Sequence, residues 1–445
     1  MGSSTSDLFW FWWALTIGLV VWQFCRAWLC PKEALALPTV LGAMWLYFYG
    51  VLPYQLVTHG TALVGSRILA IAQAQAFLAF ASLLVGWYSY LASWRNESRP
   101  KTPSVTLEFG RLWWCGVGLQ VVGLTAYYSF AASGRSFEST SAYWYTAFNL
   151  CYPGMSICAA VLVLSSQRRN PVNFLIFVGL ALLVIWPFLL GARRGPTFVA
   201  IIAIIFSCLI CRRQAPRPSQ VFGTLLGAGV LLMCLVTSRN VLYQEGGTWE
   251  ETFERLTIKD VVQDRTTKTG DNEFSNGCLL LEANLRTGLY QYGTTHLAML
   301  LHWLPRSWWP GKPMRNQGFF PSALGETAAS AEESNLGYGG AWGAVADTFD
   351  NYWWFFPIFW FLVGAGVAAM FARAVLEDSV RWKLHYVGVL CATHWFVAQC
   401  LPEALVPALF YQAAYFVAFR FATVPAQSPR PRRIRRPAFE PRPAP

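Results

Sequence analysis

Charged side chains are scarce in this chain of 445 residues, of which only 13% are Asp, Glu, Lys or Arg. A typical soluble globular domain carries about 25% of these residues. The low charge content therefore excludes a soluble globular protein. The short alternating polar and apolar segments that are typical of a membrane β-barrel are missing as well.

Several chemical signatures are also absent. The eleven cysteines include no metal-type CxxC pair, because the CxxC spacing of Cys208 and Cys211 falls inside an apolar segment, and all except Cys278 lie in or at the ends of apolar segments. This distribution excludes a disulfide framework and a cysteine-type metal site. No DxD carboxylate pair is present, and the segment around His59, "VTHGTALVGSR", has no acidic residue. We therefore expect no metal and no other cofactor. The N-terminus has neither a basic region nor a small-residue cleavage site and predicts no signal peptide.

Apolar sequence dominates instead, because 55% of the residues are hydrophobic and 16% are aromatic. Apolar runs long enough to cross a bilayer, about 18 residues or more, recur along the chain. The sequence predicts an all-α polytopic membrane protein with about 11 transmembrane helices and one large external loop that contains amphipathic helices. We expect the spans near 8–29, 36–57, 69–93, 112–132, 143–165, 171–191, 196–211, 220–237, 354–376, 384–400 and 402–422.

The basic residues orient these spans. Lys and Arg gather in the loops after the first, third, fifth, seventh and ninth spans and in the C-terminal tail "PRPRRIRRPAFEPRPAP". Cytoplasmic loops carry an excess of these residues. The pattern predicts an N-terminus outside and a C-terminus in the cytoplasm, and it explains the net charge of +11 without a nucleic-acid partner.

Four regions follow from this orientation. Residues 1–237 hold spans one to eight, 238–353 form the large external loop, 354–423 hold spans nine to eleven, and 424–445 form a basic Pro/Arg-rich tail. The loop begins polar and then becomes amphipathic, "CLLLEANLRTGLYQYGTTHLAMLLHWL", which predicts segments at the membrane surface. Loops of this length are often functional.

Arg193 and Arg194, in "LLGARRGPTFVA", stand in a short external turn, against the usual bias of basic residues. Pro196 is typical of a first helical turn, and Gly195 lets a ligand approach the backbone. Two guanidinium groups beside a helix N-terminus are suited to phosphate or pyrophosphate, and Arg239 is expected to join them. A phospholipid headgroup fits this charge too, and other loops can outvote a single exceptional turn.

Two stretches of the external loop, "YQYGTTHLAMLLHWLPRSWWPGKP" (290–313) and "ESNLGYGGAWGAVADTF" (333–349), carry a family resemblance. Together with the arginine turn at 191–196, they resemble the bacterial O-antigen and exopolysaccharide repeat-unit polymerases of the Wzy type. The motif-level likeness covers about 190–200 and 285–350. It implies a metal-independent glycosyltransferase of the bacterial inner membrane that polymerises undecaprenyl-pyrophosphate-linked oligosaccharides at the periplasmic face. A flippase and a chain-length regulator are possible protein partners of such an enzyme.

This chemistry needs cations for the leaving pyrophosphate and a base for the acceptor hydroxyl. The expected cationic residues are Arg193, Arg194, Arg239, Arg286, Arg306 and Lys312. The preferred candidates for the base are His302, Glu333 and Glu282, and His296 is a further external choice.

Each of these residues also has a structural reading. Glu282 and Arg286 are spaced as a helical ion pair, and Arg306 can cap a helix or stack on Trp308. Asp347 and Asp350, at the start of the ninth span, can pair with arginines or contact sugar hydroxyls. His394, within the tenth span, is either functional or bonded to a helix carbonyl.

Three alternatives to the polymerase remain open. An O-antigen-ligase-like enzyme or another lipid-linked glycosyltransferase fits the same substrate chemistry. A polysaccharide transporter or flippase is expected to contain inverted repeats and paired polar residues at the membrane midplane, and the sequence displays neither. A membrane protease or acyltransferase would rest on Cys278 with His296 or His302, but no recognisable feature activates that thiol.

Overall fold

The computed structural model describes residues 3–60, 62, 64–94, 106–133, 141–166, 170–190, 194–212, 216–239, 248, 250–251, 273–300, 308 and 342–424. These residues are almost entirely helical, and eight helices among them are long and apolar enough to cross a membrane. The chain is therefore an all-α polytopic membrane protein, as the sequence predicts.

Every expected span coincides with a helical element. The elements are α1 (Ser3–Leu29), α2 (Leu37–Leu46) with η2 (Tyr47–Val51) and α3 (Leu52–Thr58), α4 (Ser66–Trp94), α5 (Phe109–Ala132), α6 (Ser141–Phe148) with α7 (Cys151–Leu164), α8 (Pro171–Leu190), α9 (Arg194–Cys211), α10 (Pro218–Arg239), α18 (Phe356–Phe371) with η7 (Ala372–Leu376), α19 (Val380–Ala398) and α20 (Leu401–Ala422). Helix α9 is shorter than the eight spanning helices, and α10 and α19 fall outside that group.

Three helices form the described part of the external segment: α13 (Glu273–Thr287), α14 (Thr294–Leu300) and α17 (Gly343–Tyr352). The expected amphipathic run is thus broken at 288–293, where Gly288 and Gly293 have φ angles of 70° and 81°. Helix α17 begins before the expected ninth span, and a 3-10 turn, η6 (Trp353–Phe355), separates it from α18. Trp353, with φ 51° and ψ −139°, makes this break.

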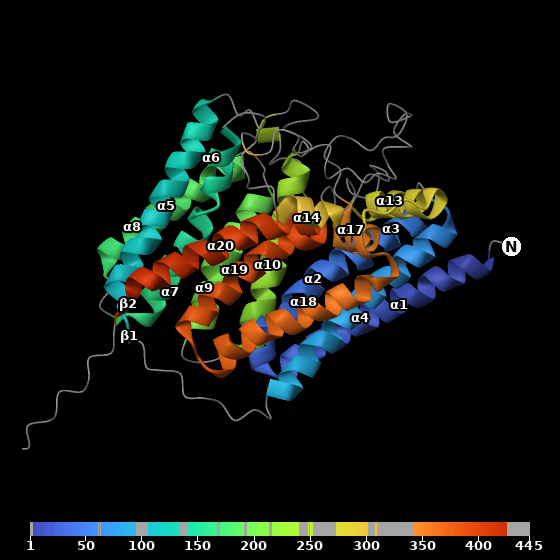
Figure 1. Cartoon of the computed structure of the whole chain (residues 1–445), viewed down its shortest axis with the longest axis horizontal. Coiled ribbons are helices and arrows are strands. Elements are labelled where there is room, and N and C mark those ends of the chain that lie inside the picture. Colours follow the sequence, from blue (N-terminus) through green and yellow to red (C-terminus); the bar gives the residue numbers. More distant parts are fainter. Residues whose placement is uncertain are drawn as a thin grey trace, which may run out of the picture.

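The bundle has two distinguishable ends. At one end, which we call the basic end, Arg26 pairs with Glu33, and Tyr386 of α19 donates to the Leu35 carbonyl. The two short strands β1 (Thr106–Leu107) and β2 (Thr423–Val424) pair antiparallel beside the last turn of α20. Figure 1 shows this ladder far from α13, α14 and α17, which gather at the other end. We call that second end the loop end.

Helices α4 and α18 form a close packing contact. A Cβ atom on Gly86 would overlap the Phe361 backbone, and one on Gly364 would overlap the Leu83 backbone. The two helices lie side by side in Figure 1, next to α1. Small residues at such contacts let helix backbones approach each other, which is how helices pack when lipid surrounds them.

Candidate functional site

A buried polar cluster lies at the loop end, where α14 and α17 meet. His296 of α14 places Nε2 3.0 Å from Asp347 Oδ2 of α17, and its Nδ1 lies 2.8 Å from the Tyr352 hydroxyl. The side chains of His296 and Asp347 are only 8% and 7% exposed. Tyr352 is half-buried. The pair is thus shielded, and the phenol links it to the protein surface.

Asp347 also reaches the junction between α19 and α20. Its Oδ2 atom accepts the backbone N–H of Leu401 at 2.9 Å, and Leu401 is the first residue of α20. The N-cap residue Cys400 supplies no side-chain acceptor, so Asp347 takes over this capping role from another helix. A carboxylate near a helix N-terminus is stabilised by the positive end of the helix dipole.

Asn351 and Thr295 hold the two helices in register. The Asn351 amide donates to the Asp347 carbonyl at 3.0 Å, and its oxygen accepts the Thr295 hydroxyl at 2.5 Å. Thr295 precedes His296 directly, so this bond fixes the start of α14 against α17. Thr295 of α14 and Asn351 of α17 therefore hold the His296 imidazole in position.

The start of α9 lies at the same end. Helix α9 starts at Arg194, which agrees with the expected helix start beside Pro196. The space above Gly195 is filled by the Trp395 ring of α19, whose Cη2 atom would lie 2.6 Å from a Cβ. Trp395 is six residues before Leu401, so the start of α9 and the start of α20 share the loop end. The indole therefore covers the Cβ side of Gly195, and the approach of a ligand to the Gly195 backbone stays a prediction.

His394 lies next to the start of α9. Its ring packs against Phe198 of α9 with the centroids 5.0 Å apart, and only 6% of the residue is exposed. It belongs to the α9–α19 contact.

The other expected site residues divide into two groups. Glu282 is half-buried and Arg286 exposed on α13, and no ion pair joins them in this described helix. Arg239 is the last residue of α10. The remaining candidates lie outside the described residues: Arg193, His302, Arg306, Lys312 and Glu333.

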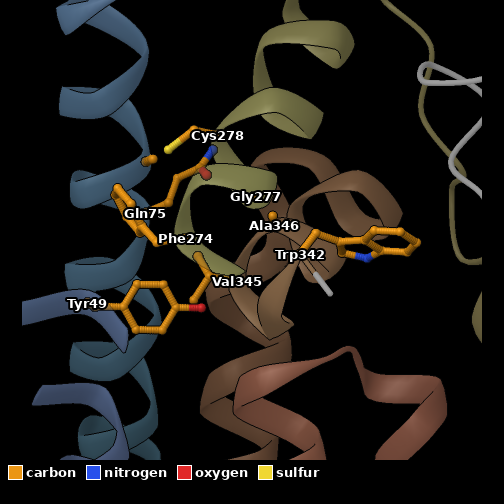
Figure 2. Close-up of a pocket in the computed structure, with 9 residues that line it drawn as sticks. Tyr49, Gln75, Phe274, Gly277, Cys278, Trp342, Val345 and Ala346 are labelled. Atoms are coloured by element: carbon orange, nitrogen blue, oxygen red, sulfur yellow. The ribbon is translucent and has the colours of Figure 1, made fainter. Parts of the chain in front are cut away.

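A small pocket lies between α4, η2, α13 and α17, with a free volume of about 250 Å³ that includes its open part. Figure 2 shows Gln75 extending from α4 toward Cys278 of α13, with Val345 and Ala346 of α17 opposite. Burial raises the pKa of the Cys278 thiol, so the thiol stays protonated and is a poor nucleophile. This pocket does not include His296 or Asp347, and the cysteine-based alternative loses its nucleophile.

The sequence predicts that His296 and Asp347 both lie on the external side, but it does not predict a hydrogen bond between them. The signal available was an external histidine and an acidic residue at the start of a span, 51 positions apart.

Among the described residues, no group of three or more His, Cys, Asp or Glu side chains is arranged to hold a metal ion. The polar cluster is built from hydrogen-bonding groups, and its chemistry is that of proton transfer and hydroxyl binding. Comparison with family models, curated proteins and solved structures gave no match to this chain.

Proposed function

We propose that the chain is a membrane glycosyltransferase that polymerises undecaprenyl-pyrophosphate-linked oligosaccharide repeat units into O-antigen or exopolysaccharide. The reaction would take place at the periplasmic face of a bacterial inner membrane, with the loop end outside. The observation that carries the proposal is the buried pair of His296 and Asp347, which shares the loop end with the start of α9.

The geometry supports His296 as the base. When Nε2–H donates to Asp347, the Nδ1 lone pair accepts the Tyr352 O–H. A hydroxyl of the acceptor sugar then gives its proton to the Tyr352 oxygen while the phenol proton passes to Nδ1. Asp347 stabilises the imidazolium that forms, which is the role of the carboxylate in a Ser-His-Asp triad.

The transfer step exchanges one bond for another. The acceptor oxygen forms a bond to the anomeric carbon of the donor glycan, and the bond from that carbon to the pyrophosphate oxygen breaks. The electron pair leaves with the pyrophosphate. Arg193 and Arg194, with the positive end of α9, would bind this anion, and such charge stabilisation is often the largest catalytic term.

The test uses purified protein in vesicles with the lipid-linked repeat unit and measures glycan length on the carrier. We expect His296→Gln to slow polymerisation by about 10²–10⁴-fold, the range for general-base catalysis. His385→Gln is the matched control, because His385 is a buried histidine of α19 that bonds Gln412 and packs on Phe419 near the basic end.

Three outcomes separate the competing functions. Equal ladders from His296→Gln and wild type would reject His296 as the base. Movement of the lipid-linked unit across the vesicle membrane without glycan growth would replace the polymerase with a flippase. Transfer of a finished glycan to a lipid A-like acceptor without elongation would indicate a ligase-like enzyme.

A further inference from the structure

A second polar group lies one helical turn beyond Asp347, between α13 and α17. Asp350 of α17 is 3% exposed and Asn284 of α13 is fully buried. The Asn284 side chain and the Gln291 backbone N–H both lie within loose hydrogen-bond range of the Asp350 carboxylate. Even so, Asp350 Oδ1 and both amide atoms of Asn284 make no hydrogen bond of acceptable geometry. Buried polar atoms are nearly always paired, so this group of three calls for an explanation.

The chemistry of these atoms selects the ligand. A carboxylate oxygen and an amide oxygen accept hydrogen bonds, whereas an amide N–H donates. A hydroxyl both donates and accepts, so one hydroxyl can bridge Asp350 and Asn284, and a neighbouring hydroxyl can donate to the Asn284 oxygen. A cation fits poorly, because the amide N–H group would face it.

An aromatic segment covers this group. Residues 288–293, which we call the tyrosine flap, run between two glycines of positive φ. Tyr290 of the flap interacts with Asp350, and its ring packs 5.8 Å from that of Phe349 and 6.5 Å from that of Trp353. An aromatic face beside hydroxyl-binding groups is suited to a sugar ring, which offers an apolar C–H face and polar edges.

The tyrosine flap is joined to α17 and η6 by few bonds. One backbone bond runs from Gln291 N–H to the Asp350 carbonyl at 2.9 Å, and the Tyr290 side chain forms a hydrogen bond with Trp353. Glycines at both ends absorb large backbone rotations at little cost, and Tyr292, with φ 48°, holds a conformation that is unfavourable for a bulky residue. Ligand binding here would require the flap to open, which would move Tyr290 from beside Asp350 and uncover the polar atoms.

We propose that Asp350 and Asn284, beneath the tyrosine flap, form a subsite that binds vicinal hydroxyls of the acceptor glycan. The subsite deepens the proposed function and rests on it for the identity of the glycan. Asp350 and Asp347 lie three residues apart on α17, so a sugar bound here places another of its hydroxyls near Tyr352 and His296.

The test is direct binding of a lipid-free oligosaccharide to the full chain in detergent. The probe is the repeat unit released by mild acid from the surface polysaccharide of the producing cell, and saturation-transfer NMR reports its affinity. We expect Asp350→Asn and Asn284→Ala each to weaken binding about 10-fold or more, because each loses a hydrogen bond in a buried site. Tyr290→Ala, at a half-buried position, tests the flap without disturbing the core and should weaken binding too.

Gln75→Leu is the matched control, because Gln75 is also buried, its Nε2 atom also lacks a partner, and it contacts the same α13 helix at the separate pocket. Its affinity should equal that of wild type. Wild-type affinity in folded Asp350→Asn and Tyr290→Ala proteins, or no binding by wild type, would overturn the subsite. Binding that depends on Asp350, in a protein that polymerises nothing, would keep the subsite and reject the polymerase.

Discussion

The Nε2 atom of His296 lies 3.0 Å from Oδ2 of Asp347, although 51 positions separate the two residues. The same oxygen accepts the Leu401 N–H, 54 positions away in the other direction. One buried carboxylate therefore joins α14, α17 and the first turn of α20. A change at Asp347 therefore acts both on the His296 imidazole and on the N-terminus of α20. Comparison of Asp347→Asn with Asp347→Ala distinguishes the effect on the reaction from the effect on stability.

Asp347→Asn should reduce polymerisation far more than it reduces stability. The amide oxygen can take the place of Oδ2 and keep both hydrogen bonds, from the Leu401 N–H and from His296 Nε2–H, but the neutral amide no longer stabilises the imidazolium through its charge. We expect a rate loss of about 10²–10⁴-fold with a nearly unchanged unfolding temperature. Asp347→Ala should also lower stability by about 1–3 kcal/mol, because the Leu401 N–H is left unpaired. Chain-length assays and thermal scans measure both, and a fully active Asp347→Asn enzyme would contradict the pairing.

The spans were predictable because apolar length is a local property of the sequence. At the ninth span, apolar length alone does not predict where the helical structure begins. Its apolar run was expected to begin at 354, but the polar sequence of α17 forms a helix before it, because that helix buries its polar residues against α13 and α14. The turn at Trp353 depends on tertiary contacts, and no local pattern announces a positive φ at a tryptophan.

The site was predictable in part for the same reason. The start of α9 followed from Pro196, a local signal, and the structure places it as expected. The contact of Gly195 with Trp395 was not predictable in this way, since Trp395 comes from a helix two hundred positions away. The pairing of His296 with Asp347 needs the packing of α14 on α17, which hydropathy and spacing do not encode.

Gly86→Ala and Gly364→Ala should each destabilise the bundle. A methyl group at either position meets the backbone of the facing helix, which cannot rotate away as a side chain can. Overpacking of this kind costs about 1–3 kcal/mol. Gly366→Ala, on the same helix α18 but facing open space, is the control and should be neutral. Thermal unfolding in detergent compares the three, and equal melting temperatures would argue against the α4–α18 contact.

Cys278 should resist alkylation in the folded protein. Burial raises the pKa of its thiol above the ordinary value of 9.0, so the folded state favours the protonated form. The contribution of the buried, protonated thiol to the free energy of unfolding is complete below the ordinary pKa. It is lost as the pH rises above the ordinary pKa toward the raised pKa of the folded protein. N-ethylmaleimide at about pH 8, near the ordinary thiol pKa, should label the exposed Cys30 and spare Cys278 until denaturant is added. Peptide mass spectrometry measures the labelling of each thiol. Equal labelling of both thiols in the folded protein would contradict the burial of Cys278.

The two ends of the bundle should face opposite sides of the membrane. Cys30 is exposed beside Glu33 at the basic end, and His59 is exposed at the far end of the second span, after α3. In spheroplasts, an impermeant maleimide should label His59→Cys and leave Cys30 unlabelled, because basic loops favour the cytoplasm. Permeabilised cells provide the control, in which both sites react. The reverse pattern would invert the orientation and place the loop end in the cytoplasm.

Gly195→Ala should impair the arginine turn through Trp395. The added methyl group lies 2.6 Å from the Trp395 ring, so either the indole or the first turn of α9 must move. Because Arg194 opens that turn, we expect a loss of polymerisation with little change in the expression level. Trp395→Phe removes the atoms that clash, and the double variant should recover activity relative to Gly195→Ala. Gly223→Ala, with no neighbour near its Cβ, controls for the substitution itself. A double variant no better than Gly195→Ala would show that the defect does not arise from this contact.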